Sequence, residues 1–137
     1  MELPPNFIQT NVNVFQGHIL ISDTYMPEIA LEQLIQLSQG KTVYSFAPEL
    51  NDIDKLGFKL CTVFRIGKVA SITTFTKDGS PHSLQIPLIV QEAVENADFN
   101  KTKVAYHVWE KGSVHQISDK AIRRARHLSE IEDSLRS

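Results

Sequence analysis

The alternation of apolar and polar residues predicts strands in the first part of the chain. Residues 7–15 place Phe7, Val12 and Val14 among Asn and Thr, and a continuous apolar run follows Gly17 at residues 18–22. Alternation with a period of two is typical of a strand with one buried face, whereas a continuous apolar run indicates a strand that is more deeply buried. We therefore predict two strands before residue 23.

Residues 27–39 have the period of an amphipathic helix. Pro27 is suited to a first helical turn, and Gly40 is suited to ending the helix. The apolar side that this helix would pack on a sheet comprises Ala30, Leu31, Leu34, Ile35 and Leu37. Residues 42–46 then resume as a strand. Their pairing with residues 18–22 is either a parallel β-α-β crossover or antiparallel, and the pattern leaves both open.

The pattern after residue 57 predicts further strands. Residues 58–90 are interpreted as a three-stranded meander that turns at Ile66-Gly67 and Asp78-Gly79, and residues 103–118 as a hairpin that turns at Gly112. The expected fold is α+β in one domain, residues 1–137. It has a mainly antiparallel sheet of seven or eight short strands, an amphipathic helix near 27–39 and a C-terminal helix near 119–135. Ser118 is a suitable N-cap for this last helix.

The C-terminal helix carries its charges in an unusual order. Basic residues come first and acidic residues come last, which opposes the helix dipole. The basic residues are Lys120, Arg123, Arg124 and Arg126, and the acidic ones are Glu130, Glu132 and Asp133. A narrow apolar stripe runs along the same helix through Ile122, Ala125, Leu128, Ile131 and Leu135. The stripe indicates that the helix docks on the domain or on a partner.

Two explanations of the basic cluster remain open. In the first, carboxylates of the same chain neutralise the cluster. They are either Glu92, Glu95 and Asp98 or Glu49, Asp52 and Asp54. In the second, the cluster binds an acidic partner, which is a protein surface or a nucleic-acid backbone.

Composition and net charge indicate the cellular compartment of the protein and the partners it could bind. The chain has 137 residues, a net charge of −2 and one cysteine, Cys61. A single cysteine cannot form an internal disulfide, and no apolar run approaches the roughly 20 residues of a membrane span. We expect a cytoplasmic protein without membrane contact. The net charge gives no general attraction to nucleic acid, so any such site would be a local patch.

Histidine pairs are the main candidates for metal chemistry. With a three-residue turn at 110–112, His107 and His115 would lie opposite each other on one face of the hairpin, with Trp109 beside them. A two-residue turn would place the two imidazoles on opposite faces. No third ligand is specified, so we predict no metal.

One segment resembles a known family. Residues 70–90, ASITTFTKDGSPHSLQIPLIV, combine small residues and threonines, a DG turn, Pro-His and a returning apolar strand. This order resembles the first hairpin of flavin-binding split-barrel proteins of the pyridoxamine-phosphate-oxidase type. The resemblance implies a flavin or another cofactor as an alternative, although no set of phosphate-binding Arg and Lys residues follows.

The expected function is that of a non-catalytic protein-interaction or regulatory domain. The chain has no glycine-rich phosphate loop, no G-x-S-x-G and no H-E-x-x-H motif, so we expect neither an enzyme nor a bound cofactor. Arginine and aromatic side chains are the usual anchors of protein interfaces. The predicted partner-binding residues are Lys120, Arg123, Arg124, Arg126, Tyr106 and Trp109. An acidic protein surface is the favoured partner, and a nucleic-acid module on the same helix is the alternative.

Overall fold

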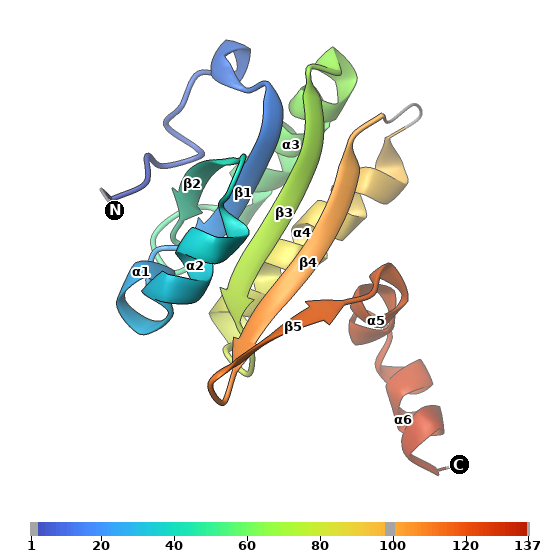
Figure 1. The fold of residues 1–137 in the computed structure, drawn as a ribbon. Coiled ribbons are helices and arrows are strands. Elements are labelled where there is room, and N and C mark those ends of the chain that lie inside the picture. Colours follow the sequence, from blue (N-terminus) through green and yellow to red (C-terminus); the bar gives the residue numbers. More distant parts are fainter. Residues whose placement is uncertain (1–2, 98–100, 137) are drawn as a thin grey trace.

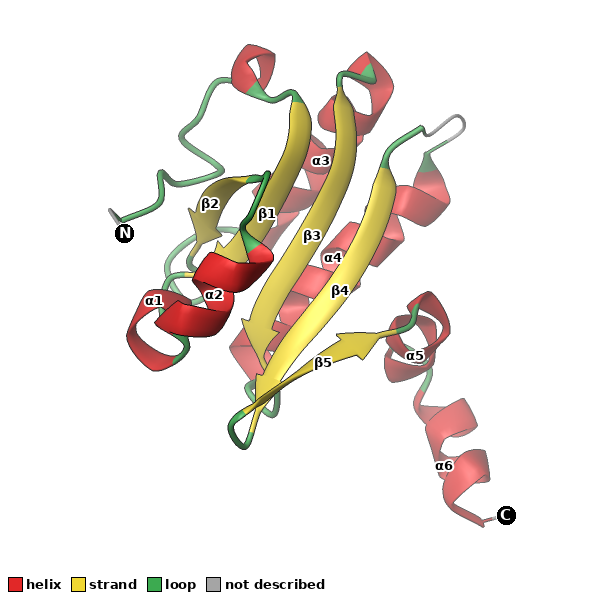
Figure 2. Cartoon of the chain, in the orientation of Figure 1, coloured by secondary structure: helices red, strands yellow, loops and turns green. Residues whose placement is uncertain are grey.

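The computed structural model describes residues 3–97 and 101–136, which form one five-stranded sheet with helices on both faces (Figures 1 and 2). The strands are β1 (Gly17–Asp23), β2 (Thr42–Phe46), β3 (Val69–Lys77), β4 (Lys103–Glu110) and β5 (Ser113–Ile117). The helices are α1 (Met26–Ile29), α2 (Leu31–Leu37), α3 (Ile53–Ile66), α4 (Pro81–Asn96), α5 (Asp119–Ala125) and α6 (Leu128–Arg136), and a short 3-10 turn, η1, spans Val12–Val14.

The sheet is mostly parallel, so the predicted α+β fold with a mainly antiparallel sheet is wrong. The strand order is β2-β1-β3-β4-β5, and β2, β1, β3 and β4 all run parallel. Only β5 is antiparallel, through its hairpin with β4. Helices α1 and α2 cover one face of the sheet, and α3 and α4 cover the other (Figure 1). This three-layer arrangement is an α/β fold.

Helix α3 is the first cause of the error, because part of it was interpreted as a strand. Its buried side chains, Leu56, Leu60, Val63 and Phe64, recur at helical spacing. The side chain of Asp52 accepts a hydrogen bond from the Asp54 amide at 2.9 Å and caps the helix start. Gly67, at a φ of 76°, ends it. The β-branched and aromatic residues of CTVFR favoured a strand locally, but the burial of one helical face overrides that preference.

Helix α4 is the second cause, because residues 81–90 were predicted as the returning strand of a hairpin. Ser80 accepts a hydrogen bond from the Ser83 amide, and Pro81 occupies the first turn. Pro87 lies inside the helix and is buried. The strand β3 therefore leads into a helix at the DG turn, and the hairpin on which the split-barrel resemblance rests does not exist.

The structure decides one pairing that the sequence left open, confirms two local predictions and shows that another is wrong. Strands β1 and β2 are parallel, which decides between the two pairings left open, and helices α1 and α2 connect them with a break at Ala30. The hairpin of β4 and β5 forms with a two-residue turn, Lys111-Gly112. Ser118 caps α5 by accepting a hydrogen bond from the Ala121 amide at 3.1 Å. The predicted strand at residues 7–15 is instead irregular and contains η1.

The N-terminal segment is part of the core. Phe7 is fully buried, and its ring stacks on Phe15 at a centroid distance of 4.5 Å and meets Tyr44 edge-on at 5.9 Å. Lys59 of α3 donates a hydrogen bond to the Ile8 carbonyl at 2.7 Å and another to the Thr10 carbonyl. Burial lowers the pKa of Lys59. The aromatic cluster and the lysine together fasten this segment to β2 and α3.

The single C-terminal helix predicted for residues 119–135 is two helices, α5 and α6, that meet at Arg126 and His127. This break removes the reversed charge order. Asp119 lies in the first turn of α5 and Arg123 and Arg124 in its last, and α6 repeats the order with Glu130 first and Arg136 last. Each short helix therefore has an acidic residue in its first turn and basic residues only or mainly towards its end, although Lys120 follows Asp119 in the first turn of α5. We call residues 119–136 the C-terminal arm.

Candidate functional site

The carboxyl edge of the parallel strands is the first place to look for a site. In open α/β sheets, ligands bind where the strand order reverses, which here lies between β1 and β3. Asp23 ends β1 at this point and is buried. Its carboxylate accepts hydrogen bonds from the Ser83 hydroxyl of α4 at 2.6 Å and from the Tyr25 amide at 2.9 Å. This contact joins the end of β1 to the start of α4.

The chemistry of this edge does not suit a phosphate. The turn after β1, Asp23-Thr24-Tyr25, contains no glycine, and its exposed neighbours Glu49 and Asp78 are acidic. The Tyr25 hydroxyl donates to Glu49 at 2.8 Å, and this hydrogen bond to the carboxylate raises the pKa of Tyr25. Within the described ranges, no three His, Cys, Asp or Glu residues are placed to hold a metal ion. The polar side chains Asp23, Tyr25, Glu49 and Ser83 at this edge thus form hydrogen bonds within the domain.

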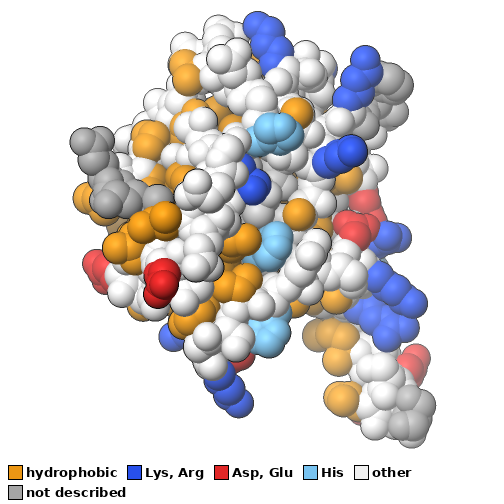
Figure 3. All heavy atoms as spheres, viewed as in Figure 1, with side chains coloured by type: hydrophobic (Ala, Val, Ile, Leu, Met, Phe, Trp, Pro, Cys, Tyr) orange, Lys and Arg blue, Asp and Glu red, His pale blue; other side chains and the backbone are white. Residues whose placement is uncertain are grey.

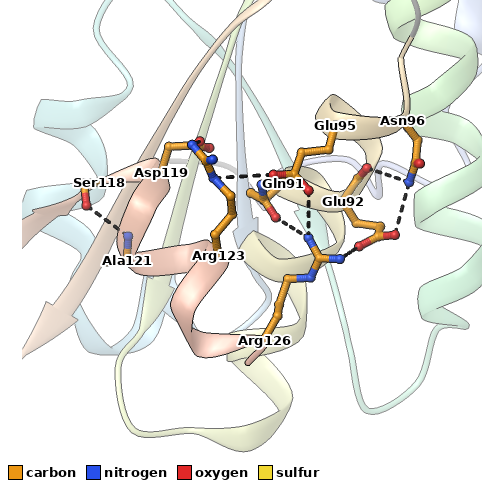
Figure 4. A network of polar contacts seen from close by, with 9 residues as sticks. All are labelled: Gln91, Glu92, Glu95, Asn96, Ser118, Asp119, Ala121, Arg123 and Arg126. Carbon is orange, nitrogen blue, oxygen red and sulfur yellow. Dashed lines mark hydrogen bonds and ion pairs between the residues drawn. The ribbon is translucent and has the colours of Figure 1, made fainter. Parts of the chain in front are cut away.

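A second polar network joins the C-terminal arm to α4 (Figure 4). The guanidinium group of Arg126 donates hydrogen bonds to Gln91 Oε1 at 2.5 Å and to Glu95 Oε2 at 3.2 Å, and it forms an ion pair with Glu92. Asn96 donates to Glu92 Oε1 at 3.1 Å and orients that carboxylate. Gln91 is fully buried, so water cannot reach its side-chain carbonyl oxygen. Arg126 donates the hydrogen bond that this oxygen needs.

Arg123 completes this network from the same helix. It pairs with Asp119 at 2.6 Å and with Glu95 at 3.4 Å. The ion pair with Asp119 raises the pKa of Arg123. Glu92 and Glu95, two of the internal carboxylates predicted as partners of the basic cluster, thus bind Arg123 and Arg126. The third, Asp98, lies outside the described residues.

Lys120 and Arg124 point elsewhere and are exposed. Together with Arg123 and His127 they form the basic side of a hollow of about 660 Å³, whose other side is Glu130, Asp133 and Ser134. Of the four predicted basic residues, two therefore hold the arm on the domain, and two present their charges to solvent.

The two predicted aromatic anchors are not on one surface. Tyr106 is buried beside Ile122 of α5, in the core between the sheet and α4. Its burial, together with the nearby Asp119 and Glu95 carboxylates, raises the pKa of Tyr106. Trp109 is half-buried on the opposite face of the sheet, against the cluster that contains Phe75. Tyr106 therefore packs in the same core cluster as Ile122 of the arm, and its side chain is not exposed for a partner to bind.

Helix α6 carries an unburied apolar stripe that the sequence pattern did identify. Leu128 is 78% exposed, Leu135 is 75% exposed, and Ile131 between them is half-buried. In Figure 3 the arm projects from the body of the domain, and its hydrophobic and basic side chains lie on opposite sides in that view. Within the described residues, α6 packs closely only on α5. Among the described elements, none covers Leu128 and Leu135 on its apolar side.

The two hairpin histidines do not form a pair. The two-residue turn sets His115 opposite Val108 and His107 opposite Gln116, so the imidazoles lie on different faces. His107 Nδ1 is buried and has no hydrogen-bond partner within the described part of the chain. Burial lowers the pKa of His107, and the nearby charge of Lys41 lowers it further.

His107 should make folding sensitive to mild acid. Its folded pKa lies below the ordinary value of 6.5, so the unfolded chain binds more protons between these two pKa values. The free energy of unfolding is expected to fall as the pH drops below about 6.5 towards the folded pKa. Urea unfolding at a series of pH values measures this slope. His107→Gln should flatten it, and His115→Gln, which removes an exposed imidazole, should leave it unchanged.

The strand order and the helices on both faces of the sheet define a three-layer α/β domain of the doubly wound type. Residues 14–136 match the family described as Rossmann-like domain, so the chain belongs to this family. The chain shows no significant similarity to curated proteins or to solved structures. None of the described helices combines the length and the apolar character needed to cross a membrane.

Proposed function

We propose that this chain is a protein-interaction domain that presents α6 to a groove on a partner protein. The observation that carries the proposal is the exposed stripe of Leu128, Ile131 and Leu135 on a helix that projects from the domain. Large apolar side chains gathered on one exposed side mark interaction surfaces.

The spacing and length of α6 support this role. The three side chains occupy positions i, i+3 and i+7, which is the spacing of the anchors of a helix bound in a hydrophobic groove. A helix of nine residues is too short to be stable by its own hydrogen bonds in water. Burial of the stripe by a partner would supply the missing stabilisation.

The exposed cations of the arm indicate the chemistry of the partner. Lys120 and Arg124 would steer an acidic protein surface towards the arm, which keeps the partner class expected from the sequence. Arg123 and Arg126 would act indirectly, because they position α5. Nucleic acid fits less well, since the carboxylates of Glu130 and Asp133 line the same hollow as the exposed cations.

The side chains at the carboxyl edge of the sheet also support a non-catalytic role. The buried Asp23 is already bound by Ser83 and by the Tyr25 amide, and the acidic side chains nearby would repel a nucleotide phosphate. We place the domain in the cytoplasm, where its single cysteine, exposed on α3, would stay reduced.

Changing two leucines tests the proposal. In the double variant Leu128→Ser/Leu135→Ser, capture of a host protein by the immobilised chain is expected to fall at least about tenfold, because each buried leucine contributes about 1.5–3 kcal/mol. The bound proteins are quantified by mass spectrometry. Both side chains are exposed, so the unfolding midpoint should not change.

The matched control is Leu50→Ser, which alters a leucine that is 87% exposed and lies outside the arm. Capture should be the same as with the unchanged chain. Equal capture by the double variant would contradict the proposal. Capture that disappears after nuclease treatment, or that weakens steeply with salt, would identify nucleic acid as the partner instead.

A further inference from the structure

One face of the sheet is open over β3, β4 and β5. Helices α1 and α2 lie mainly over β2 and β1 on this side, and none of the described helices packs closely on the same side of β4 or β5 (Figure 1). Helices normally cover both faces of a parallel sheet. The part of this face that stays uncovered is therefore a candidate binding surface.

The strand register identifies the side chains on this surface. Phe75 belongs to the core cluster beneath α1 and α2, so its register partner His107 points to the same side. Because side chains alternate along a strand, Lys103 and Trp109 of β4 point there too. A neighbouring strand and the loop before β2 complete the set. We define the open sheet face by His18, Lys41, Lys103, His107 and Trp109.

Contacts connect these side chains across the sheet. His18 Nδ1 lies 2.7 Å from the Ser71 hydroxyl oxygen, and Ser71 is the register partner of both His18 and Lys103. Lys41 donates a hydrogen bond to the Leu37 carbonyl at 2.8 Å, and its charge is close enough to His107 to lower the pKa of that imidazole. The five residues thus share one continuous surface.

This surface is basic, although the net charge of the chain is −2. Lys103 and His18 are exposed, and Lys41 is half-buried. None of the residues of β1, β3, β4 and β5 that point to this side is acidic. In Figure 3, which views this side, histidine and lysine side chains lie over the strands and no acidic side chain lies between them. The open sheet face is therefore complementary to an anionic partner.

Aromatic rings and a small side chain give this surface a flat shape. Trp109 is half-buried against the cluster that contains Phe75, so part of its ring stays accessible. His107 is also half-buried, and Ala105 lies between it and Lys103. Lys103 and Trp109 are six residues apart on β4, which is roughly 20 Å at about 3.3 Å per residue. Rings that bases can stack on and lysines that reach phosphates are the two parts of a surface that binds single strands.

We infer that the open sheet face binds single-stranded nucleic acid, with a base stacked on the Trp109 indole and phosphates paired with Lys41 and Lys103. An exposed sheet face can hold two or three unpaired bases on its rings. A second copy of the chain does not suit this face, because a two-fold axis would set the same cations opposite each other. The site goes beyond the proposed function and is separate from the arm, since α5 packs on α4 on the other side of the sheet.

Titration with a ten-nucleotide run of uridine, followed through Trp109, tests the stacking. Trp109 is the single tryptophan, so quenching of its fluorescence on binding reports contact with the indole itself. Trp109→Leu should weaken binding at least about fivefold, because one stacked base is worth about 1–3 kcal/mol. Trp109→Phe keeps a ring and should restore most of the affinity, measured by anisotropy of the labelled oligonucleotide. Unfolding midpoints of both variants show whether the fold is intact.

A salt series tests the phosphate contacts. The logarithm of the binding constant should fall with the logarithm of salt concentration with a slope of about −0.7 for each phosphate contact, or about −1.4 for two lysines. Lys41→Gln/Lys103→Gln should remove most of this slope. The matched control is Lys120→Gln/Arg124→Gln, which removes the same charge from the arm and should bind the oligonucleotide like the unchanged chain.

Three comparisons decide the outcome. A duplex of the same length should bind more weakly, because its bases are already stacked and paired. Thymidine runs beside uridine runs separate DNA from RNA, and tighter binding of either one supports the site. Leu128→Ser/Leu135→Ser keeps the open sheet face and should bind normally, so this test is independent of α6. Absence of binding at low salt would overturn the inference. Equal binding of the duplex, or a slope and affinity that Lys41→Gln/Lys103→Gln leaves unchanged, would do the same.

Discussion

Replacing Phe7 with alanine is expected to lower the free energy of unfolding by about 3–5 kcal/mol, the usual range for a buried phenylalanine. Phe7 lies before the residues that match the family, yet none of its surface is exposed. The change removes the stacked contact with Phe15 and the edge contact with Tyr44, and it leaves a cavity beside α3. Urea unfolding followed through the fluorescence of Trp109, the single tryptophan, measures the effect.

Leu3→Ala is the matched control for this prediction. Leu3 lies four residues earlier and is 86% exposed, so its truncation should change stability by less than about 0.5 kcal/mol. A loss of less than about 1 kcal/mol in Phe7→Ala would mean that the N-terminal segment does not belong to the core.

The second large effect is expected at Arg126. Arg126→Ala should destabilise the domain by about 2 kcal/mol, because it leaves the buried Gln91 carbonyl and the Glu92 carboxylate without their cation. The loss should be concentrated in the arm. Hydrogen exchange of the α5 amides, measured beside that of β3, should show faster exchange in α5 alone.

Arg124→Ala provides the control from the same helix. Its side chain is exposed, and no ion pair with it is seen among the described residues, so the free energy of unfolding should change by less than about 0.5 kcal/mol. If Arg124→Ala and Arg126→Ala were equally destabilising, the ion pairs with α4 could not be what holds the arm.

The sequence predicted the elements whose local signals agree with their tertiary surroundings. The apolar run of β1, the hairpin turn at Gly112 and the Ser118 cap all belong to this group. Helices α3 and α4 were missed because their residues favour strands locally. Val63 and Phe64 have high strand preference, and Pro87 is rarely found inside a helix. The helix signals were nevertheless present, in Asp52 and Gly67 around α3 and in Ser80-Pro81 before α4.

One part of the candidate site, the apolar stripe of α6, was predicted because its signal is also local. The stripe of Leu128, Ile131 and Leu135 can be read from the helical period alone. The pairing of Arg126 with Glu92 and Glu95 was only one of the explanations left open, because these carboxylates are more than 30 residues earlier in the chain and only the packing of α5 on α4 brings them together. The charge order that seemed to oppose one helix dipole is the normal order for two helices. Only the break at Arg126 and His127 reveals this.

The contact between the N-terminal segment and β2 has a consequence for solubility. Strand β2 is the last strand on its side of the sheet, and an open strand edge can pair with other molecules and start aggregation. The Ser45 amide donates to the Pro5 carbonyl at 2.9 Å, and the Ser45 carbonyl accepts from Phe7 at 2.8 Å. Pro4 and Pro5 have no amide hydrogen to offer a further strand. The segment thus blocks this edge against unwanted sheet extension.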